Sequence, residues 1–266
     1  MRDYYFDEQT YQSVLSDIIN GIEKNTALQK NHAVLFLGAQ PGAGKSTFCN
    51  MDNNFTDYIV INGDNYRKNH PFYNEIVLHN KENMAELTQS FVNSVVEDLI
   101  KELSKEGYNL IIEGTLRDAN VPISTCSMLR EQGYRTELYV IGCSACESWE
   151  STISRAELMA EIEYIPRLVP IDKYNLIVNS IVENLEKIET SGCMDRIVVL
   201  SRDSKVLWKG DTENGDDNAS VALSKVLNVL EWNRKFEMYR NEYELLVEKF
   251  KEGNGTRIVR NRRGGR

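Results

Sequence analysis

A glycine-rich stretch around residue 40 has the residue types and spacing of a phosphate-binding loop. It comprises Gly42, Ala43, Gly44, Lys45, Ser46 and Thr47, and it follows a short apolar run. Glycines let backbone amides turn toward an anion with no Cβ in the way, and the N-terminus of a following helix adds a partial positive charge. Lys45 can reach the β- and γ-phosphates of a nucleotide, and the Ser46 hydroxyl can ligate Mg²⁺. The stretch predicts binding of ATP with Mg²⁺; the alternative is a glycine-rich turn with a chance Gly-Lys-Ser.

This loop predicts nucleotide binding but leaves the reaction open. The usual spacing places its first glycine at position 39, where this chain has Ala39, which is tolerable if the backbone keeps a negative φ. A GTPase would carry Asn-Lys-x-Asp after a late strand, and the nearest string, Asn-Lys-Glu-Asn at 80–83, lacks the aspartate. A motor or AAA-type ATPase normally has an acidic pair at the end of a strand, and the sequence shows none. A small-molecule kinase fits better.

Acidic side chains follow two further apolar runs at points suited to phosphoryl transfer. Asp64 comes shortly after the run at 58–61, and Glu113 directly after the run at 110–112. In open parallel sheets, ligand-binding and catalytic residues lie beyond the carboxyl ends of the strands. We therefore expect both acids near the phosphate-binding loop. Asp64 could take the proton of an attacking hydroxyl, or it caps the next helix. Glu113 could hold Mg²⁺ through water, bind the acceptor, or be a buried acid held by a lysine or backbone amides.

Two arginines are candidates for the cations that a transferred phosphoryl group needs. Arg155 and Arg167 flank the segment 156–166, which could close over the nucleotide as a lid. Surface arginines are common, so the lid is a hypothesis. Glu97, taken by itself, is interpreted as a solvated charge on a helix surface.

The elements that must position these residues alternate between strand and helix. Continuous apolar runs predict buried strands at 33–37, 58–61, 110–112, 137–141 and 196–200. Apolar residues at helical spacing predict helices at 8–30, 84–103, 146–160, 171–190 and 219–251. This alternation predicts an α/β fold of the P-loop NTPase type, with a mostly parallel sheet flanked by helices on both faces and a C-terminal helical extension.

The same pattern predicts the domain organisation. We expect a P-loop kinase domain with an N-terminal helix at 1–210, a helical extension packed on the same domain at 211–255, and a basic, disordered tail at 256–266. The polar stretch at 211–218 is expected to be a loop. The tail carries Arg257, Arg260, Arg262, Arg263 and Arg266 with no acid. Basic, glycine-rich ends of this kind are more often disordered than nucleic-acid-binding arms.

Composition narrows the classes of function. A net charge of −9 speaks against broad binding of nucleic acid or an anionic membrane. No run has the length of a signal peptide or a membrane span, which predicts a cytoplasmic location. Of the five cysteines, only Cys143 and Cys146 form a Cys-x-x-Cys. Buried thiols in a reducing compartment are the better interpretation, and a redox motif is the alternative.

Several segments together resemble the zeta toxin family. They are the loop at 42–46, the motif Asn-Gly-Asp-Asn-Tyr-Arg at 62–67 with His-Pro at 70–71, and the stretch at 107–115 that ends in Glu-Gly-Thr. The stretch at 121–134 is similar too. The resemblance runs from about residue 33 to about residue 184, with weaker similarity to residue 210. The acidic strand end with its His-Pro and the Glu-Gly-Thr strand end are fairly specific, whereas the loop alone is not.

The resemblance implies a kinase that transfers the γ-phosphate of ATP to the 3′-hydroxyl of the amino sugar of UDP-N-acetylglucosamine. It also implies a toxin that a small helical antitoxin neutralises by blocking the ATP site. Two departures bear on this expectation. Ala39 replaces the first glycine of the loop, and Asn62 and Gly63 vary the residues just before the acid, which could alter the geometry of Mg²⁺ or of the acceptor.

The resemblance also implies roles for single residues. Asp64 takes the position of the catalytic base. The phosphate and Mg²⁺ positions fall on Lys45 and Ser46, and the nucleotide-phosphate arginines on Arg155 and Arg167. The positions that bind the sugar nucleotide fall on Glu97, Glu113 and Thr115.

Two other functions remain open at this point. A kinase with another acceptor, such as a nucleoside, an antibiotic or a different amino sugar, would use the same fold and the same Asp64. A nucleotide-responsive binding protein would have no acceptor, and it would tolerate the loss of Asp64 and of both lid arginines.

Overall fold

The computed structural model describes residues 4–23, 31–45, 47–48, 55–162, 168–210 and 218–263, with side chains followed to residue 250. Two predicted site residues, Ser46 and Arg167, lie outside these ranges, and so does most of the predicted loop, 211–217.

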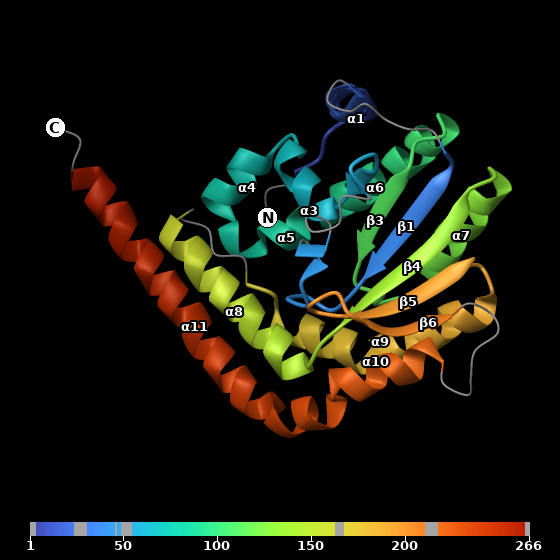
Figure 1. Cartoon of the computed structure of the whole chain (residues 1–266). Helices are drawn as coiled ribbons and strands as arrows, with labels where there is room; N and C mark the ends of the chain where they lie inside the picture. Colours follow the sequence, from blue (N-terminus) through green and yellow to red (C-terminus); the bar gives the residue numbers. More distant parts are fainter. Residues whose placement is uncertain are drawn as a thin grey trace.

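A six-stranded sheet with the order β2-β3-β1-β4-β5-β6 forms the centre of the molecule (Figure 1). Its parallel strands are β1 (Ala33–Gly38), β2 (Ile59–Ile61), β3 (Leu110–Gly114), β4 (Arg135–Gly142) and β5 (Arg196–Ser201). These are the five strands that the apolar runs predict, which confirms the mostly parallel α/β fold. The β2 and β3 strands lie together beside β1, so their carboxyl ends open on the same side as the loop that follows β1.

The sixth strand, β6 (Val206–Gly210), is not predicted by the sequence. It pairs antiparallel with β5 at the edge of the sheet, after a tight turn in which Ser204 has a φ of 62°. Val206 and Leu207 are exposed. An edge strand of this kind needs no continuous apolar run, which explains why apolar periodicity did not reveal it.

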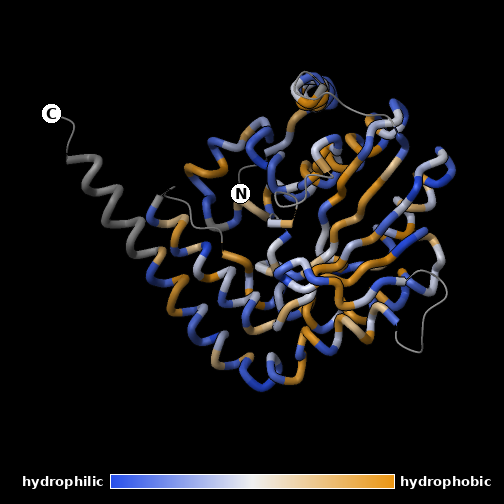
Figure 2. Tube along the Cα trace, viewed as in Figure 1, coloured by the Kyte–Doolittle hydropathy of each residue, from blue (hydrophilic) through white to orange (hydrophobic). Residues whose placement is uncertain are grey.

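Both faces of the parallel strands are buried. Alternate residues of β1, Val34 and Phe36, belong to the larger core cluster, which also includes residues of the flanking helices. Leu35 and Leu37 point to the other face, into a smaller cluster with Phe48. Side chains alternate across a strand, so burial on both faces requires the continuous apolar runs seen in the sequence. Figure 2 shows these strands as the apolar centre of the chain.

Helices flank the sheet and contain several of the predicted site residues. Their bounds are α1 (Glu8–Glu23), α3 (Gly63–Tyr66), η2 (Arg67–Asn69), α4 (Tyr73–His79), η3 (Lys81–Asn83), α5 (Met84–Leu87), α6 (Gln89–Lys105), α7 (Asn120–Glu131), α8 (Ala145–Ile162), α9 (Ile171–Ser191), α10 (Ala219–Leu227) and α11 (Val229–Arg263). Within the ranges given above, every helix is too short or too polar to cross a lipid bilayer.

Two helices expected to be continuous are broken. The predicted helix at 84–103 divides into α5 and α6 at Thr88, whose buried hydroxyl donates to the carbonyl oxygen of Met84. The predicted helix at 219–251 divides into α10 and α11 at Asn228, which has a φ of 51°. Asparagine tolerates this left-handed backbone better than most residues. Apolar spacing continues across both breaks, so the spacing did not reveal them.

The C-terminal helix runs as a long arm beside α8 and α9 (Figure 1). Trp232 of α11 is fully buried, its ring lies 4.9 Å from that of Tyr174, and its indole nitrogen donates to Asn175 at 2.8 Å. The Tyr239 hydroxyl donates to Glu150 of α8 at 2.7 Å. The backbone of α11 continues as helix to Arg263, whereas the composition of 256–266 predicts a disordered tail.

Candidate functional site

The phosphate-binding loop has the backbone that its glycines predict. Gly42 and Gly44 have φ values of 81° and 104°, in a region that other residues rarely adopt. Among the described residues, their backbone amides donate to no protein acceptor, so both remain available to an anion. Ala39 is fully buried and is not among the residues with a positive φ. Alanine at this position is therefore compatible with the loop.

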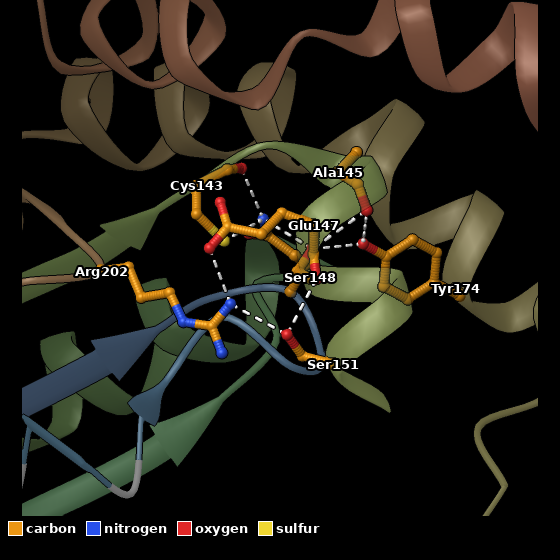
Figure 3. Close-up of polar contacts among 8 residues, drawn as sticks. Cys143, Ala145, Glu147, Ser148, Ser151, Tyr174 and Arg202 are labelled. Carbon is orange, nitrogen blue, oxygen red and sulfur yellow. Dashed lines mark hydrogen bonds and ion pairs between the residues drawn. The ribbon is translucent and has the colours of Figure 1, made fainter. Parts of the chain in front are cut away.

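Close packing holds the loop against α8. A Cβ at Gly42 would lie 2.0 Å from the carbonyl oxygen of Ser148, so only glycine fits there. The buried Gln40 amide donates to the carbonyl oxygen of Cys143 at 3.0 Å and to the Ser148 hydroxyl at 3.3 Å. Ser148 in turn forms a short hydrogen bond with the Tyr174 hydroxyl of α9, as Figure 3 shows. Sequence motifs gave no signal for these three polar side chains.

Lys45 lies where charges from three other elements meet. Its ammonium group donates to the carbonyl oxygen of Ala39 at 2.9 Å. Burial lowers the pKa of Lys45 to about 8; Glu113 and Asp64 oppose this shift, and Arg155 adds to it. The charges of Glu113, Arg155 and Asp64 therefore all act on Lys45. A lysine that directly follows the turn of Gly42 and Gly44 suits a bound polyphosphate, because it adds a cation to backbone amides that can donate to an anion.

Asp64 lies in the first turn of α3, but it is not the cap of that helix. The cap is Asn62, whose side-chain oxygen accepts from the backbone amide of Asp64 at 3.0 Å. The carboxylate of Asp64 is 56% exposed, and one of its oxygens accepts from Arg67 at 2.8 Å. Because Asn62 caps α3, Asp64 is not the helix cap, and its exposed carboxylate keeps one oxygen that does not accept from Arg67.

Glu113 is the second-last residue of β3 and lies beside the end of β1, where the phosphate-binding loop begins. It is in register with Leu37 of β1, and the amide of Ala39 donates to the carbonyl oxygen of Gly114 at 3.3 Å. Burial raises the pKa of Glu113; Lys45 opposes the shift, Asp64 adds to it, and the hydrogen bond from Asn62 opposes it. The same Asn62 thus contacts both acids.

The loop after β3 carries Thr115, which is half-buried. The next residue, Leu116, has a φ of 52°, and its side chain fills the space that a Cβ of Gly38 would occupy. Buried Asn184 of α9 donates to the carbonyl oxygens of Leu116 and Arg117 at 2.9 and 2.8 Å. A strained, doubly anchored loop at a strand end is typical of a binding segment.

Glu97 and Arg155 are both exposed side chains on helices. Glu97 follows Gln89 and Asn93 on α6 at helical spacing, and Gln89 contacts both Asn93 and Arg67. This places Glu97 on the same face of α6 that reaches the Asp64 region. Arg155 lies on α8 and contributes to the pKa of Lys45.

A further arginine, missed by sequence reasoning, bridges the phosphate-binding loop and α8. Arg202 directly follows β5, and its guanidinium donates to Glu147 and to Ser151, each at 2.9 Å (Figure 3). Its aliphatic part lies 3.5 Å from the position of a Cβ at Gly44. Glu147, Ser151 and Arg155 follow one another at four-residue spacing, so the bridge lies one turn away from Arg155.

The described residues contain no group of three or more His, Cys, Asp or Glu side chains able to hold a metal ion. Mg²⁺ does not require such a group, because it keeps several waters and is bound by one or two protein groups together with substrate phosphates. Glu113 is near the loop, and Ser46 lies outside the described ranges.

Cys143 and Cys146 are buried, and burial raises the pKa of each thiol, that of Cys143 to about 11. A redox role needs a lowered thiol pKa, so the Cys-x-x-Cys alternative is disfavoured.

Comparisons with known proteins identify the family of this chain. The family model described as Zeta toxin matches residues 17–213. Toxin PezT of Streptococcus pneumoniae serotype 4 is 30% identical over 225 residues, which are 84% of this chain and 88% of that protein. Toxin zeta of Streptococcus pyogenes is 27% identical over 252 residues, 93% of this chain and 88% of that protein.

A solved structure gives the same result. It comes from a characterisation of the PezAT chromosomal toxin–antitoxin system of Streptococcus pneumoniae, and it matches with a TM-score of 0.75 at 28% identity, covering 91% of this chain and 98% of its own. The family model spans most of the sequence, including the loop and both acidic strand ends. The chain therefore belongs to the zeta toxin family.

Proposed function

We propose that this chain transfers the γ-phosphate of ATP to the 3′-hydroxyl of the amino sugar of UDP-N-acetylglucosamine. Members of the zeta toxin family are kinases, which supports nucleotide-dependent phosphoryl transfer. The observation that carries the proposal is the meeting of Lys45, Asp64 and Glu113 at the carboxyl ends of neighbouring strands, where the charge of each acid acts on Lys45.

The proposed step uses the two sides of this site. A lone pair of the acceptor hydroxyl forms a bond to the γ-phosphorus. The bond from that phosphorus to the β,γ-bridging oxygen breaks, and its electron pair leaves with ADP. The hydroxyl proton passes to a carboxylate oxygen of Asp64, while Lys45 offsets negative charge on the phosphates.

The remaining residues divide between nucleotide and acceptor. The free amides of Gly42 and Gly44 and the guanidinium of Arg155 suit the phosphates of ATP. When bound, Mg²⁺ supplies charge neutralisation between the β- and γ-phosphates, with Ser46 as its proposed protein ligand. Glu97, Glu113 and Thr115 are proposed to bind the sugar nucleotide, and Arg167 to contact the nucleotide phosphates.

A partner is also part of the proposal. The structural relative comes from a toxin–antitoxin system, and we propose that a small helical antitoxin covers the ATP site of this chain and so neutralises a toxin. Displacement of a fluorescent ATP analogue by such an antitoxin would support this. Simultaneous binding of both would exclude a blocked ATP site.

A phosphate-transfer assay tests the reaction. Purified protein with Mg-ATP is offered a panel of UDP-sugars, nucleosides and aminoglycosides, and products are identified by mass spectrometry and phosphorus NMR. We expect a new phosphate on the amino sugar of UDP-N-acetylglucosamine. Asp64→Ala should lower the rate about 10²- to 10⁴-fold and leave ATP affinity nearly unchanged. The matched control is Asp17→Asn, an exposed acid on α1, which should retain full activity.

The other outcomes are equally informative. Phosphorylation of a different panel member would retain the kinase and replace the acceptor. ATP binding without any phosphorylated product, together with a biological effect that survives Asp64→Ala, would favour a nucleotide-responsive binding protein.

A further inference from the structure

Arg67 is firmly anchored next to the proposed active site. It follows Asp64 by three residues, and its guanidinium makes four hydrogen bonds. One goes to the Asp64 carboxylate at 2.8 Å, and the others go to Ala85, Thr88 and Gln89 at 2.8–2.9 Å. Every nitrogen of the guanidinium is therefore engaged.

The anchors of Arg67 all lie at the break between α5 and α6. Nη1 donates to the carbonyl oxygen of Ala85 and to the hydroxyl of Thr88, the residue at which the predicted helix is interrupted. Nη2 donates to the side chain of Gln89, which also holds Asn93. The break thus creates a set of acceptors that matches the planar, five-donor fork of an arginine, which a lysine cannot reproduce.

Exposure separates the roles of the two partners. The Arg67 side chain is 11% exposed, whereas that of Asp64 is 56% exposed. A mostly covered guanidinium with every nitrogen engaged is poorly placed to contact a substrate. Its Nε holds only one of the two carboxylate oxygens, so the other oxygen of Asp64 can face an acceptor hydroxyl.

We propose that Arg67 is the positioning residue of the base Asp64: it fixes the plane of the carboxylate from the α5–α6 junction and directs the second oxygen toward the acceptor. This inference rests on the proposed function, in which Asp64 takes the proton. Misplacement of a catalytic group by about 1 Å can cost about 10²-fold in rate. Loss of the anchored Arg67 guanidinium should therefore lower kcat.

The kinetic test compares two conservative substitutions. Arg67→Lys keeps the positive charge and loses the fork, and we expect kcat to fall about 10²-fold while the KM for ATP stays within about twofold. The matched control is Arg130→Lys, because Arg130 also binds an aspartate, Asp195, and a backbone carbonyl. That substitution should leave kcat unchanged. Wild-type kcat in Arg67→Lys would overturn the proposal.

A second variant guards against a general folding defect. Gln89→Ala removes one anchor of the guanidinium from an exposed position. If Gln89 acts through Arg67, the substitution Gln89→Ala should lower kcat in the wild-type background. The same substitution should have no further effect on kcat in Arg67→Lys, since the effects of coupled residues are not additive. Additive losses would overturn the pathway through Arg67. Equal melting temperatures of Arg67→Lys and Arg130→Lys would show that stability does not explain the difference.

A structural readout separates this inference from the proposed function. In the crystal structure of Arg67→Lys, we expect the Asp64 carboxylate to rotate away from its wild-type orientation. In the crystal structure of Arg130→Lys, the Asp64 carboxylate should keep that orientation. An unchanged carboxylate in Arg67→Lys would refute the positioning role whatever the acceptor is. If wild-type protein phosphorylates no UDP-sugar, the proposed substrate fails, and the crystal structures still decide the role of Arg67.

Discussion

The side-chain amide of Asn62 donates to Glu113 at 3.0 Å, while its oxygen accepts from the backbone amide of Asp64. One asparagine thus links the ends of two neighbouring strands and both acids of the site. Asn62, one of the two residues that vary the family pattern just before Asp64, therefore caps α3 and links the two acidic residues.

Removal of this link should affect both stability and acceptor binding. We expect Asn62→Ala to lower the free energy of unfolding by about 1–2 kcal/mol, because a helix cap and a hydrogen bond to an acid are lost. The KM for the acceptor should rise, since Glu113 loses the hydrogen bond from Asn62. Asn218 caps α10 in the same way, through Val221 at 2.9 Å. Asn218→Ala should therefore cost similar stability in urea unfolding and leave the KM unchanged; a matching rise in its KM would contradict the role given to Asn62.

The depressed pKa of Lys45 predicts a stability that depends on pH. Its pKa is about 8 in the folded chain and 10.5 as the ordinary value, so the unfolded chain binds more protons between these pH values. The charge destabilises the folded state fully below pH 8 and ceases to do so as the pH rises to 10.5. Lys45→Met should therefore be more stable than wild type by about 1–3 kcal/mol near pH 7, and this gain should vanish above about pH 10.5.

Guanidinium unfolding at several pH values measures this effect. Lys187→Met is the control, because Lys187 is an exposed partner of Glu183 on α9, and it should show no such gain. A Lys45→Met variant that is less stable than wild type at pH 7 would mean that burial does not dominate at this site. The same variant should bind ATP weakly, since the phosphates lose their cation.

Gly42 should be irreplaceable because of space as well as backbone conformation. Gly42 and Gly133 have nearly equal φ values of 81° and 82°. A Cβ at Gly42 would meet the carbonyl oxygen of Ser148 at 2.0 Å, whereas one at Gly133 meets nothing within 4 Å. We expect each alanine variant to lose about 1 kcal/mol from the strained φ, but only Gly42→Ala to lose ATP binding in calorimetry. Normal ATP affinity in Gly42→Ala would show that the loop relaxes without consequence.

Asn184 of α9 should hold the loop that follows β3 and carries Thr115. Asn184→Ala leaves the carbonyl oxygens of Leu116 and Arg117 without their donor, which should cost about 1–3 kcal/mol and raise the KM for the acceptor. The control is Asn109→Ala, a buried asparagine that accepts from the backbone amides of Asn31 and Ala33 at the other end of β1. It should lose stability with no change in KM. Equal kinetic effects of the two variants would point to general destabilisation.

Local pattern was sufficient for the parts of the protein that follow from near neighbours in the chain. Strands buried on both faces need continuous apolar runs, so the five parallel strands could be predicted from composition along the chain. The loop at 42–47 depends on glycines, a lysine and a helix start that are adjacent in sequence. Asp64 and Glu113 could be placed near it because parallel strands end on one side of a sheet.

The contacts that orient these groups depended on tertiary structure. Asn184 reaches Leu116 across 68 residues, and Arg202 reaches Ser151 across 51, distances at which periodicity carries no information. The acceptors of Arg67 exist only because α5 and α6 break at Thr88, and apolar spacing runs through that break. The chain by itself thus determined the five parallel strands, the phosphate-binding loop and the acids at the strand ends. Packing between layers decided which polar side chains hold them, because hydrogen bonds between distant segments depend on three-dimensional proximity.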